Sequence, residues 1–305
     1  MSGRVSVVIP TYGEEPEVLE RSIRSALRQT ISNIEVIVVD DNSDTPVDSV
    51  LKSIIDERLS LIQHEINRGG SAARNTGANN SNGEYIAFLD ADDEWLPSKL
   101  ERQIDYLEKK PRKYTACLCA KKSVRRGITK GFRKYISHHN IFDTKDTESV
   151  PLEGGQILIP YLLKGEYPTG GSSTILIYRA TFDAIGGFDE SFNRHQDWEF
   201  IIRAAKQTNI AHVENELVLK HASDPPDADT LKKSKIKLLN TFGDDIINAE
   251  LSPWELYRIH RNDLGMMYIA NGELILGLDY LDIRNLELKD SARIVFKYFS
   301  SFVNY

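Results

Sequence analysis

The sequence predicts an α/β protein built on a mostly parallel sheet and followed by a helical C-terminal region. In the first third of the chain, short runs of apolar, often β-branched residues alternate with segments of helical periodicity. Runs that are apolar at nearly every position are typical of strands buried on both faces, as in parallel sheets covered by helices. Polar residues follow the ends of these runs, where such sheets bind ligands.

The predicted elements of this first third are strand, helix, strand, helix, strand, helix and strand. The strands are expected at Arg4–Ile9, Ile34–Val39, Leu59–Gln63 and Tyr85–Leu89. Pro16 is a common first residue of a helix, and Leu19 and Ile23 follow it at helical spacing. A second helix is expected over Val47–Ile55, and a third follows the small residues Gly69–Ala73.

Composition places the chain among ordinary globular proteins. It has 305 residues, 41% hydrophobic and 27% charged, with a formal net charge of −7, which argues against nucleic-acid binding. No apolar run approaches the roughly 20 residues that span a bilayer, and no signal segment is recognised, so a cytoplasmic protein is expected. Cys117 and Cys119 are too close along one strand to pair and too few for zinc, so we expect buried thiols.

Three carboxylates follow the fourth predicted strand. Asp90, Asp92 and Asp93 stand directly after an apolar run. Like charges at this spacing repel unless a cation lies among them, and Mg²⁺ or Mn²⁺ is the usual partner, often shared with a substrate phosphate. The alternative is that Asp92 or Asp93 caps a helix over 94–100, since aspartate is a preferred N-cap residue.

Polar residues after the first two strands favour a site. Thr11 and Glu14 follow the first strand, and Asp40 and Asp41 follow the second. Each is also a common turn residue, but the ends of parallel strands share one edge of a sheet, so these side chains are expected near the carboxylates. Arg74 is either a surface residue or a ligand for phosphate or carbonyl oxygens, which its guanidinium fits.

Four segments together resemble the motifs of family 2 glycosyltransferases, which use nucleotide-activated sugars. They are Val5–Tyr12 with Glu14, Val38–Ser43, Asn67–Gly77 and Phe88–Asp93. The resemblance covers residues 4–222 and implies the GT-A fold, a Rossmann-like, mixed, mostly parallel sheet flanked by helices. It implies a glycosyltransferase domain over 1–224, with a nucleotide-binding half (1–100) and an acceptor-side half (101–224), and a helical region over 225–305.

The resemblance also implies roles for individual residues. Those implied to bind the nucleotide sugar are Pro10, Thr11, Tyr12, Glu14, Asp41, Arg74, Asp90 and Ala91. A divalent cation, Mn²⁺ or Mg²⁺, would be held by Asp92 and Asp90, and would stabilise the charge of the leaving diphosphate. His221 is a further candidate metal ligand, with an ordinary surface or core histidine as the alternative. Asp93 is then left to cap the following helix.

A second resemblance lies at His195–Arg203, where the family places its catalytic base at the start of a helix. Asp197 matches that position. Such a carboxylate is needed because an acceptor hydroxyl is a poor nucleophile until its proton is removed. The alternative is that Asp197 only favours the helix N-terminus. Many relatives have Glu-Asp where this chain has Gln196-Asp197, which would alter activity if the preceding residue were the base. The loop Tyr167–Ser173 would face the reacting sugar.

Residues 109–142 contain lysine and arginine but no aspartate or glutamate. Such a run is either solvated surface or a region attracted to an anionic membrane or a phosphate-linked lipid acceptor, so peripheral membrane contact through 109–134 is one expectation. Further along, helices without a functional signature are predicted at Leu231–Phe242, Pro253–Asn271, Glu273–Leu281 and Ser291–Tyr305.

The expected function is inverting, metal-dependent transfer of a sugar from a nucleotide sugar, first of all a UDP-sugar, to a hydroxyl acceptor such as a lipid-linked or cell-surface glycan precursor. Asp92 would bind the metal and diphosphate, and Asp197 would act as general base. A non-catalytic relative that binds nucleotide or glycan is the alternative, because of Gln196. A sugar nucleotidyltransferase is less well supported, since the loop Pro10–Glu15 is acidic and lacks a Gly-rich phosphate loop followed by a basic residue.

Overall fold

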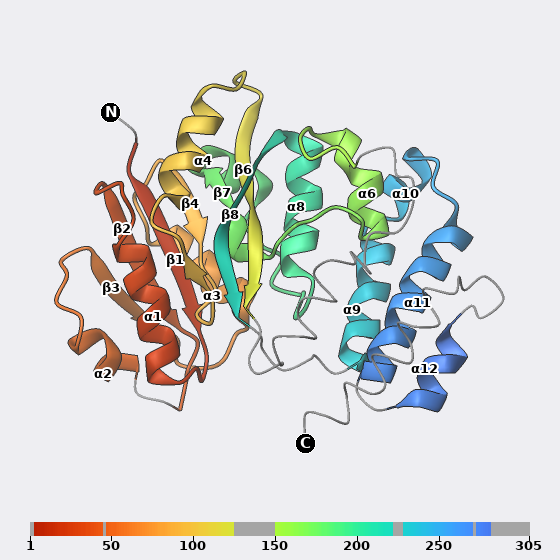
Figure 1. Cartoon of the computed structure of the whole chain (residues 1–305), viewed down its shortest axis with the longest axis horizontal. Coiled ribbons are helices and arrows are strands. Elements are labelled where there is room, and N and C mark those ends of the chain that lie inside the picture. Colours follow the sequence, from red (N-terminus) through yellow and green to blue (C-terminus); the bar gives the residue numbers. More distant parts are fainter. Residues whose placement is uncertain (1–2, 45–46, 125–149, 222–227, 271–272, 282–305) are drawn as a thin grey trace, which may run out of the picture. The chain divides into compact units, whose positions relative to one another are not determined.

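The computed structural model describes residues 3–44, 47–124, 150–221, 228–270 and 273–281 and contains a mixed sheet (Figure 1). Within these residues the strand order is β3-β2-β1-β4-β7-β6-β8-β5. The strands are β1 (Val5–Thr11), β2 (Ile34–Asp40), β3 (Leu59–Gln63), β4 (Tyr85–Phe88), β5 (Glu94–Trp95), β6 (Tyr114–Val124), β7 (Leu176–Tyr178) and β8 (Asn209–His221).

The first four strands are parallel, as predicted. β1 pairs with β2 and with β4, and β2 pairs with β3. They alternate with α1 (Pro16–Leu27), α2 (Val47–Lys52) and α3 (Gly70–Asn79), so α2 ends before the predicted Ile55, which is exposed. The strands β1 and β4 are buried along almost their whole length, which explains their continuous apolar runs.

The second half of the sheet changes direction at β7. This strand is antiparallel to both β4 and β6, whereas β6 and β8 are parallel to each other. The short strand β5 completes the sheet antiparallel to β8. The sheet is therefore mixed and mostly parallel, which confirms the predicted fold class.

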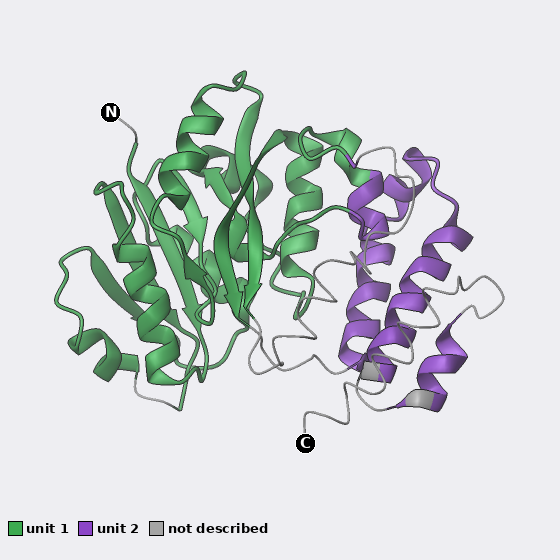
Figure 2. Cartoon of the chain, in the orientation of Figure 1, with its two compact units in different colours: residues 1–125, 151–159, 167–223 green, residues 126–150, 160–166, 224–305 purple. Residues whose placement is uncertain are grey.

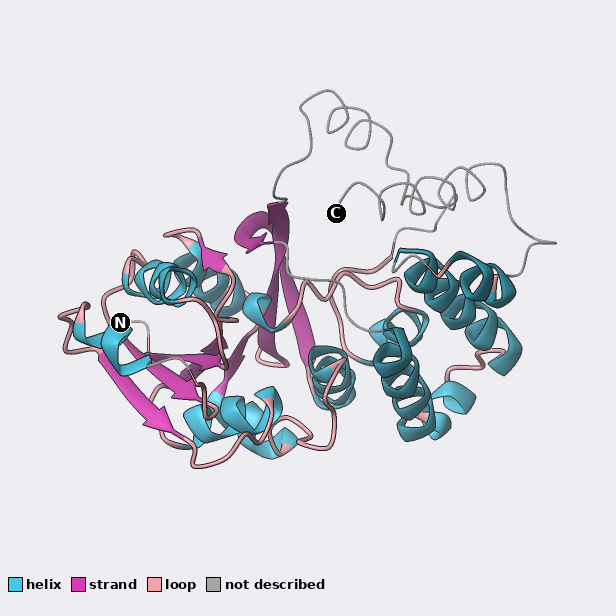
Figure 3. Ribbon diagram, turned by 90° about the horizontal axis from the view of Figure 1, so that it is seen from below, coloured by secondary structure: helices cyan, strands magenta, loops and turns pink. Residues whose placement is uncertain are grey.

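Helices cover both faces of the sheet (Figure 3). On one face, α1 and α4 (Lys99–Glu108) share a core with alternate residues of β1, β2 and β6. On the other face, Phe88 of β4 contacts Phe182 of α7 (Arg179–Ile185), and Phe188 stacks on Phe200 of α8 (Gln196–Gln207). Cys117 and Cys119 lie buried and unpaired on β6, as predicted, and burial raises the pKa of Cys119 to about 11.

The chain divides into two compact units (Figure 2): residues 1–125, 151–159 and 167–223 in the first, and 126–150, 160–166 and 224–305 in the second. The expected helical region 225–305 therefore shares its unit with residues 160–166, most of α6 (Ile159–Lys164). The helices after residue 225 are α9 (Ala228–Thr241), α10 (Gly243–Asn248), α11 (Pro253–Ala270) and α12 (Leu274–Tyr280). The predicted helix Ser291–Tyr305 lies outside the described residues.

Buried polar contacts connect the helices of the second unit. Lys235 of α9 donates to Asp263 of α11 across 2.7 Å, and His260 of α11 lies 2.7 Å from the carbonyl oxygen of Leu163 in α6. Burial and the charge of Lys235 lower the pKa of His260 to about 4. None of the described helices combines the length and apolar character that a membrane span requires.

Lys99, the first residue of α4, is fully buried at 0% exposure. Its Nζ donates to Gln103 Oε1 across 2.7 Å and lies 3.9 Å from the centroid of the Trp95 ring. Gln103 in turn donates to the carbonyl oxygens of Cys117 and Thr174. No carboxylate of the described residues pairs with Lys99, and burial lowers its pKa from 10.5 to about 8.

We expect Lys99→Met to remove a pH dependence of stability. The pKa of Lys99 is about 8 in the folded protein against an ordinary 10.5, so the folded state binds fewer protons than the unfolded chain between these values. The wild-type free energy of unfolding should therefore rise with pH there, by about 1–2 kcal/mol relative to the variant between about pH 7.5 and pH 9.5. Urea unfolding at several pH values measures this difference.

The exposed Lys52→Met variant serves as the control, because Lys52 forms only a surface pair with Asp48 at 3.7 Å. The difference between its free energy of unfolding and that of the wild type should not change with pH. An equally flat difference for Lys99→Met would contradict the prediction.

Candidate active site

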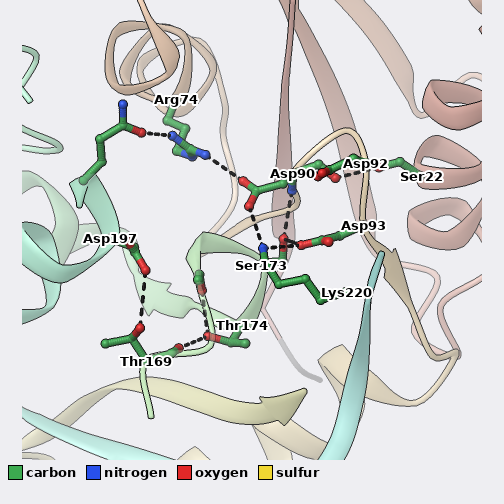
Figure 4. Close-up of polar contacts among 12 residues, drawn as sticks. Ser22, Arg74, Asp90, Asp92, Asp93, Thr169, Ser173, Thr174, Asp197 and Lys220 are labelled. Atoms are coloured by element: carbon green, nitrogen blue, oxygen red, sulfur yellow. Dashed lines mark hydrogen bonds and ion pairs between the residues drawn. The ribbon is translucent and has the colours of Figure 1, made fainter. Parts of the chain in front are cut away.

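Strand direction brings several chain segments to one edge of the sheet. β1, β2 and β4 are parallel and end there at Thr11, Asp40 and Phe88. Because β7 runs opposite to β4, the loop that precedes it, residues 169–173, also lies at this edge. β8 runs parallel to β6 and therefore ends at the same edge, at His221. Figure 4 shows the side chains that meet here.

The three predicted carboxylates lie directly beyond β4. Asp90, Asp92 and Asp93 each offer an oxygen, and these oxygens lie within 4.8 Å of one another. Arg74 of α3 and Lys220 of β8 are the cations paired with them. Three carboxylates so close together need such cations, because each raises the free energy of ionising the others.

Asp90 is held by both cations. Arg74 Nη2 lies 2.6 Å from its Oδ1, and Lys220 Nζ lies 3.4 Å from its Oδ2. Its backbone N–H donates to Ser173 Oγ across 3.0 Å. Burial by itself would raise the pKa of Asp90, but Arg74 and Lys220 outweigh it and hold the pKa at about 2. Asp90 is therefore ionised at neutral pH. Arg74 lies beside it, and its expected contact with a nucleotide stays a prediction.

Asp93 is fully buried, which contradicts its predicted role as a helix cap. The chain first forms β5, and α4 begins only at Lys99, with Ser98 at the N-cap. Asp93 Oδ2 instead accepts hydrogen bonds from Ser173 Oγ at 2.6 Å and Lys220 Nζ at 3.0 Å, and its buried Oδ1 has no partner among the described residues. Burial and the charge of Asp90 raise the pKa of Asp93 to about 6, against the opposing effect of Lys220.

Asp92 is partly exposed, as is Asp90, whereas Asp93 is buried. Arg21 donates to the backbone carbonyl oxygen of Asp92 across 2.9 Å, but no other described residue donates a hydrogen bond to its carboxylate. Burial and the charge of Asp90 raise the pKa of Asp92, against the opposing effect of Lys220. An accessible carboxylate next to two others is the donor set that a hard divalent cation requires, so these residues fit such an ion.

The residues predicted after β1 form a tight turn. Thr11 Oγ1 and the backbone N–H of Tyr12 both donate to Glu14 Oε2, each across 2.6 Å. Pro10 lies within β1, and the Tyr12 side chain is 57% exposed beside this turn. Glu14 thus orders the loop, and Tyr12 is the member of this group that is open to a ligand.

Asp41, after β2, is buried and accepts several hydrogen bonds from its own chain. Its oxygens accept from the backbone N–H groups of Arg68 at 2.9 Å and Gly69 at 2.7 Å, and His64 Nδ1 lies 2.7 Å away. Asp41 thereby positions the segment that leads into α3 and Arg74. Ala91, between the carboxylates, is also buried.

Asp197 lies in the first turn of α8 and contacts the loop that precedes β7. Thr169 Oγ1 donates to Asp197 Oδ2 across 3.3 Å. The preceding Gln196 accepts a hydrogen bond from Arg74 Nη1 across 2.8 Å. Arg74 thus connects Asp90 with the start of α8, so the site brings the carboxylates and the candidate base together although about a hundred residues separate them in the sequence.

His221 lies apart from the carboxylates. Its Nε2 is 3.5 Å from Glu94, and it does not join the group of three in the described residues, so its proposed role as a metal ligand stays a prediction. The preceding residue, Lys220, occupies the position next to Asp90 and Asp93. Sequence reasoning missed Lys220, Ser173 and the contact of Gln196 with Arg74. Lys220 could have been found as a polar residue at a strand end, like Asp90.

Sequence comparison supports the resemblance. The model of glycosyl transferase family 2 matches residues 6–161. The amylovoran biosynthesis glycosyltransferase AmsB of Erwinia amylovora is 31% identical over 211 residues, which cover 66% of this chain and 64% of that protein. The UDP-Glc:alpha-D-GlcNAc-diphosphoundecaprenol beta-1,3-glucosyltransferase WfgD of Escherichia coli is 39% identical over 105 residues, 34% of this chain and 41% of that protein. The chain thus spans less than two thirds of the length of these relatives.

Structure comparison confirms the GT-A fold. S. aureus TarS 1-349 is similar with a TM-score of 0.61 at 17% identity, over 99% of this chain and 91% of that one. The mannosyltransferase PcManGT from Pyrobaculum calidifontis, in complex with GDP-Man and Mn²⁺, gives a TM-score of 0.60 at 16% identity, over 100% of this chain and 81% of that one.

We expect Ser173→Ala to destabilise the protein by about 1–3 kcal/mol, because it leaves buried polar groups unpaired. The hydroxyl donates to Asp93 Oδ2 and accepts from the backbone N–H of Asp90. Urea unfolding measures the change. Ser60→Ala, at an exposed position of β3, is the control and should change stability by less than about 0.5 kcal/mol. Equal stability of the two variants would show that Ser173 does not hold the carboxylates.

Proposed function

The chain belongs to glycosyl transferase family 2, and from this premise we propose that it transfers a sugar from a nucleotide-sugar donor to a hydroxyl group of an acceptor. One observation carries the proposal: the carboxylates beyond β4 and the carboxylate of Asp197 lie at the same edge of the sheet. Asp92 is open beside Asp90 and Asp93, and Asp197 stands across the site on α8. The first can hold a metal, and the second can accept a proton.

The donor is proposed to be a nucleoside diphosphate sugar, first of all a UDP-sugar. The name of WfgD specifies UDP-Glc, and TarS 1-349 was solved with UDP-GlcNAc and with UDP. PcManGT was solved with GDP-Man, so a GDP-sugar is the second candidate. The proposed donor-binding residues are Pro10, Thr11, Tyr12, Glu14, Asp41, Arg74, Asp90 and Ala91.

Asp92, with Asp90, is the proposed holder of Mn²⁺ or Mg²⁺. Asp92 suits this role because its carboxylate takes no hydrogen bond from the other described residues, whereas Asp93 is engaged by Ser173 and Lys220. When bound, a divalent cation there would offset the negative charge that the diphosphate gains as the sugar leaves. Arg74 supplies a fixed positive charge at the same edge through its contact with Asp90.

Asp197 is the proposed general base. Thr169 donates to Oδ2 and so orients the carboxylate, which leaves Oδ1 to accept the proton of the acceptor hydroxyl. The oxygen then attacks the anomeric carbon opposite the diphosphate, and the anomeric centre is inverted. Gln196 cannot accept a proton as a carboxylate does, and its amide oxygen is taken by Arg74. The non-catalytic alternative therefore requires that Asp197 accept no proton from an acceptor.

The acceptor is proposed to be a lipid-linked or cell-surface glycan precursor. The name of WfgD specifies a diphosphoundecaprenol-linked acceptor, and AmsB is named for amylovoran biosynthesis. Membrane contact through residues 109–134 and a cytoplasmic location belong to the same proposal. Residues 125–149 lie outside the described part of the chain, and Lys110, within it, pairs with Glu153 at 2.5 Å.

A panel of nucleotide sugars tests the donor and the metal together. With Mn²⁺ present, we expect one nucleoside diphosphate to raise the thermal unfolding temperature and its sugar derivative to be consumed with release of that diphosphate. Asp92→Asn should weaken this binding at least about tenfold, because charge-assisted contacts contribute at that scale. Asp183→Asn, exposed on α7, is the control and should bind as wild type does. Failure of every nucleotide to bind wild type would overturn the proposal.

Asp197→Asn separates binding from chemistry. We expect unchanged donor affinity by calorimetry and a loss of transfer of about 100-fold or more, since general-base catalysis contributes at that scale. Transfer near the wild-type rate would refute the assignment of the base. The non-catalytic alternative would instead be supported if the wild-type protein bound a nucleotide sugar but transferred the sugar neither to an acceptor nor to water.

A further inference from the structure

Lys220 is the one residue of β8 that reaches into the carboxylates from the far half of the sheet (Figure 4). Its Nζ lies 3.0 Å from Asp93 Oδ2 and 3.4 Å from Asp90 Oδ2. The Lys220 side chain is 31% exposed, whereas the Asp93 side chain is 0% exposed. The two carboxylates therefore hold the Lys220 ammonium, while its side chain as a whole stays partly exposed.

The loop before β7 closes around this ammonium. A Cβ atom at Gly171 would lie 3.1 Å from Lys220 Nζ, and Gly171 has a φ of +91°, which other residues rarely adopt. Ser173 of the same loop donates to Asp93 Oδ2, the oxygen that also accepts from Lys220. The position of Lys220 is thus determined by two carboxylates and by the loop of residues 169–173, where Gly171 has no side chain to displace the ammonium.

Hydrogen-bonding capacity shows what Lys220 has left to offer. An ammonium has three N–H donors and no acceptor. Two donors point to Asp93 and Asp90, the acceptors that the structure shows for this group. The described residues supply no acceptor for the third, which can therefore donate to an anionic oxygen of a ligand.

We propose that Lys220 is a resident cation of the donor site, which contacts the diphosphate of the bound nucleotide sugar and restricts the divalent cation to Asp92 and Asp90, away from Asp93. This inference rests on the proposed function. When the bond between the anomeric carbon and the phosphate oxygen breaks, its electron pair stays on that oxygen, and the diphosphate gains one negative charge. Lys220 stabilises this charge by its position and transfers no proton.

The proposal makes two opposite predictions about binding. In the nucleotide-free protein, a divalent cation competes with the ammonium for Asp90 and Asp93, so Lys220 weakens metal binding. In the donor complex, the ammonium adds an attractive contact with the diphosphate, so Lys220 strengthens nucleotide binding. A residue that served only to stabilise the fold would not move these two affinities in opposite directions.

The test measures Mn²⁺ and UDP binding to the full chain. For Lys220→Met, Mn²⁺ binding without nucleotide, followed by electron paramagnetic resonance, should tighten by about tenfold, because one competing charge is removed. UDP binding at saturating Mn²⁺, followed by calorimetry, should weaken by about tenfold or more. Lys220→Arg keeps the charge and should lie closer to wild type in both. Lys52→Met, which removes a surface lysine that is also paired with a carboxylate, should match wild type in both.

A double variant distinguishes the loss of the ammonium from a folding defect. Asp93→Asn with Lys220→Met removes both charges and leaves no buried carboxylate without its cation. It should still bind UDP about tenfold more weakly than wild type, because the ammonium is absent. UDP affinity equal to wild type in this variant, or parallel loss of Mn²⁺ and UDP binding in Lys220→Met, would overturn the inference and leave the proposed function standing. Failure of wild type to bind any nucleoside diphosphate would overturn the proposed function itself, and the inference with it.

Discussion

Repulsion among the carboxylates beyond β4 is the constraint on which the site depends. Asp90, Asp92 and Asp93 lie together in a partly buried place, where ionised groups interact more strongly than in water. Ions of like charge persist there only because Arg74 and Lys220 lie among them. The two cations come from different elements, Arg74 from helix α3 and Lys220 from strand β8, and both contact Asp90.

The pKa of each carboxylate depends on which cations lie next to it. Asp90 touches both, and its pKa is held at about 2, whereas Asp93 touches one and has a pKa raised to about 6 by burial and by Asp90. Asp92 touches neither and has a raised pKa as well. Asp92 is thus partly exposed and is not paired with a cation in the described residues. For this reason a divalent ion is proposed at Asp92 rather than among all three.

The change of strand direction at β7 gives the site its second half. An all-parallel sheet would have placed the loop of residues 169–173 at the opposite edge, away from the carboxylates. Because β7 is antiparallel to β4, this loop reaches Asp93 through Ser173 and Asp197 through Thr169. The same loop therefore orders the proposed metal side and the proposed base, and Arg74 connects them a second time through Gln196.

The sequence by itself determined the first four strands, the alternating helices and the cluster of carboxylates, because burial on both faces and strand ends leave strong local patterns. It also marked Arg74 and Asp197 through a resemblance to known motifs. Only the tertiary structure decided that Asp93 is buried in the site instead of capping α4, and that Lys220 lies beside it. Those outcomes depend on β5 and β8, which pair with each other from positions over a hundred residues apart. No local pattern records which side chains such a pairing brings together, so the charge balance of the site becomes visible only in the folded chain.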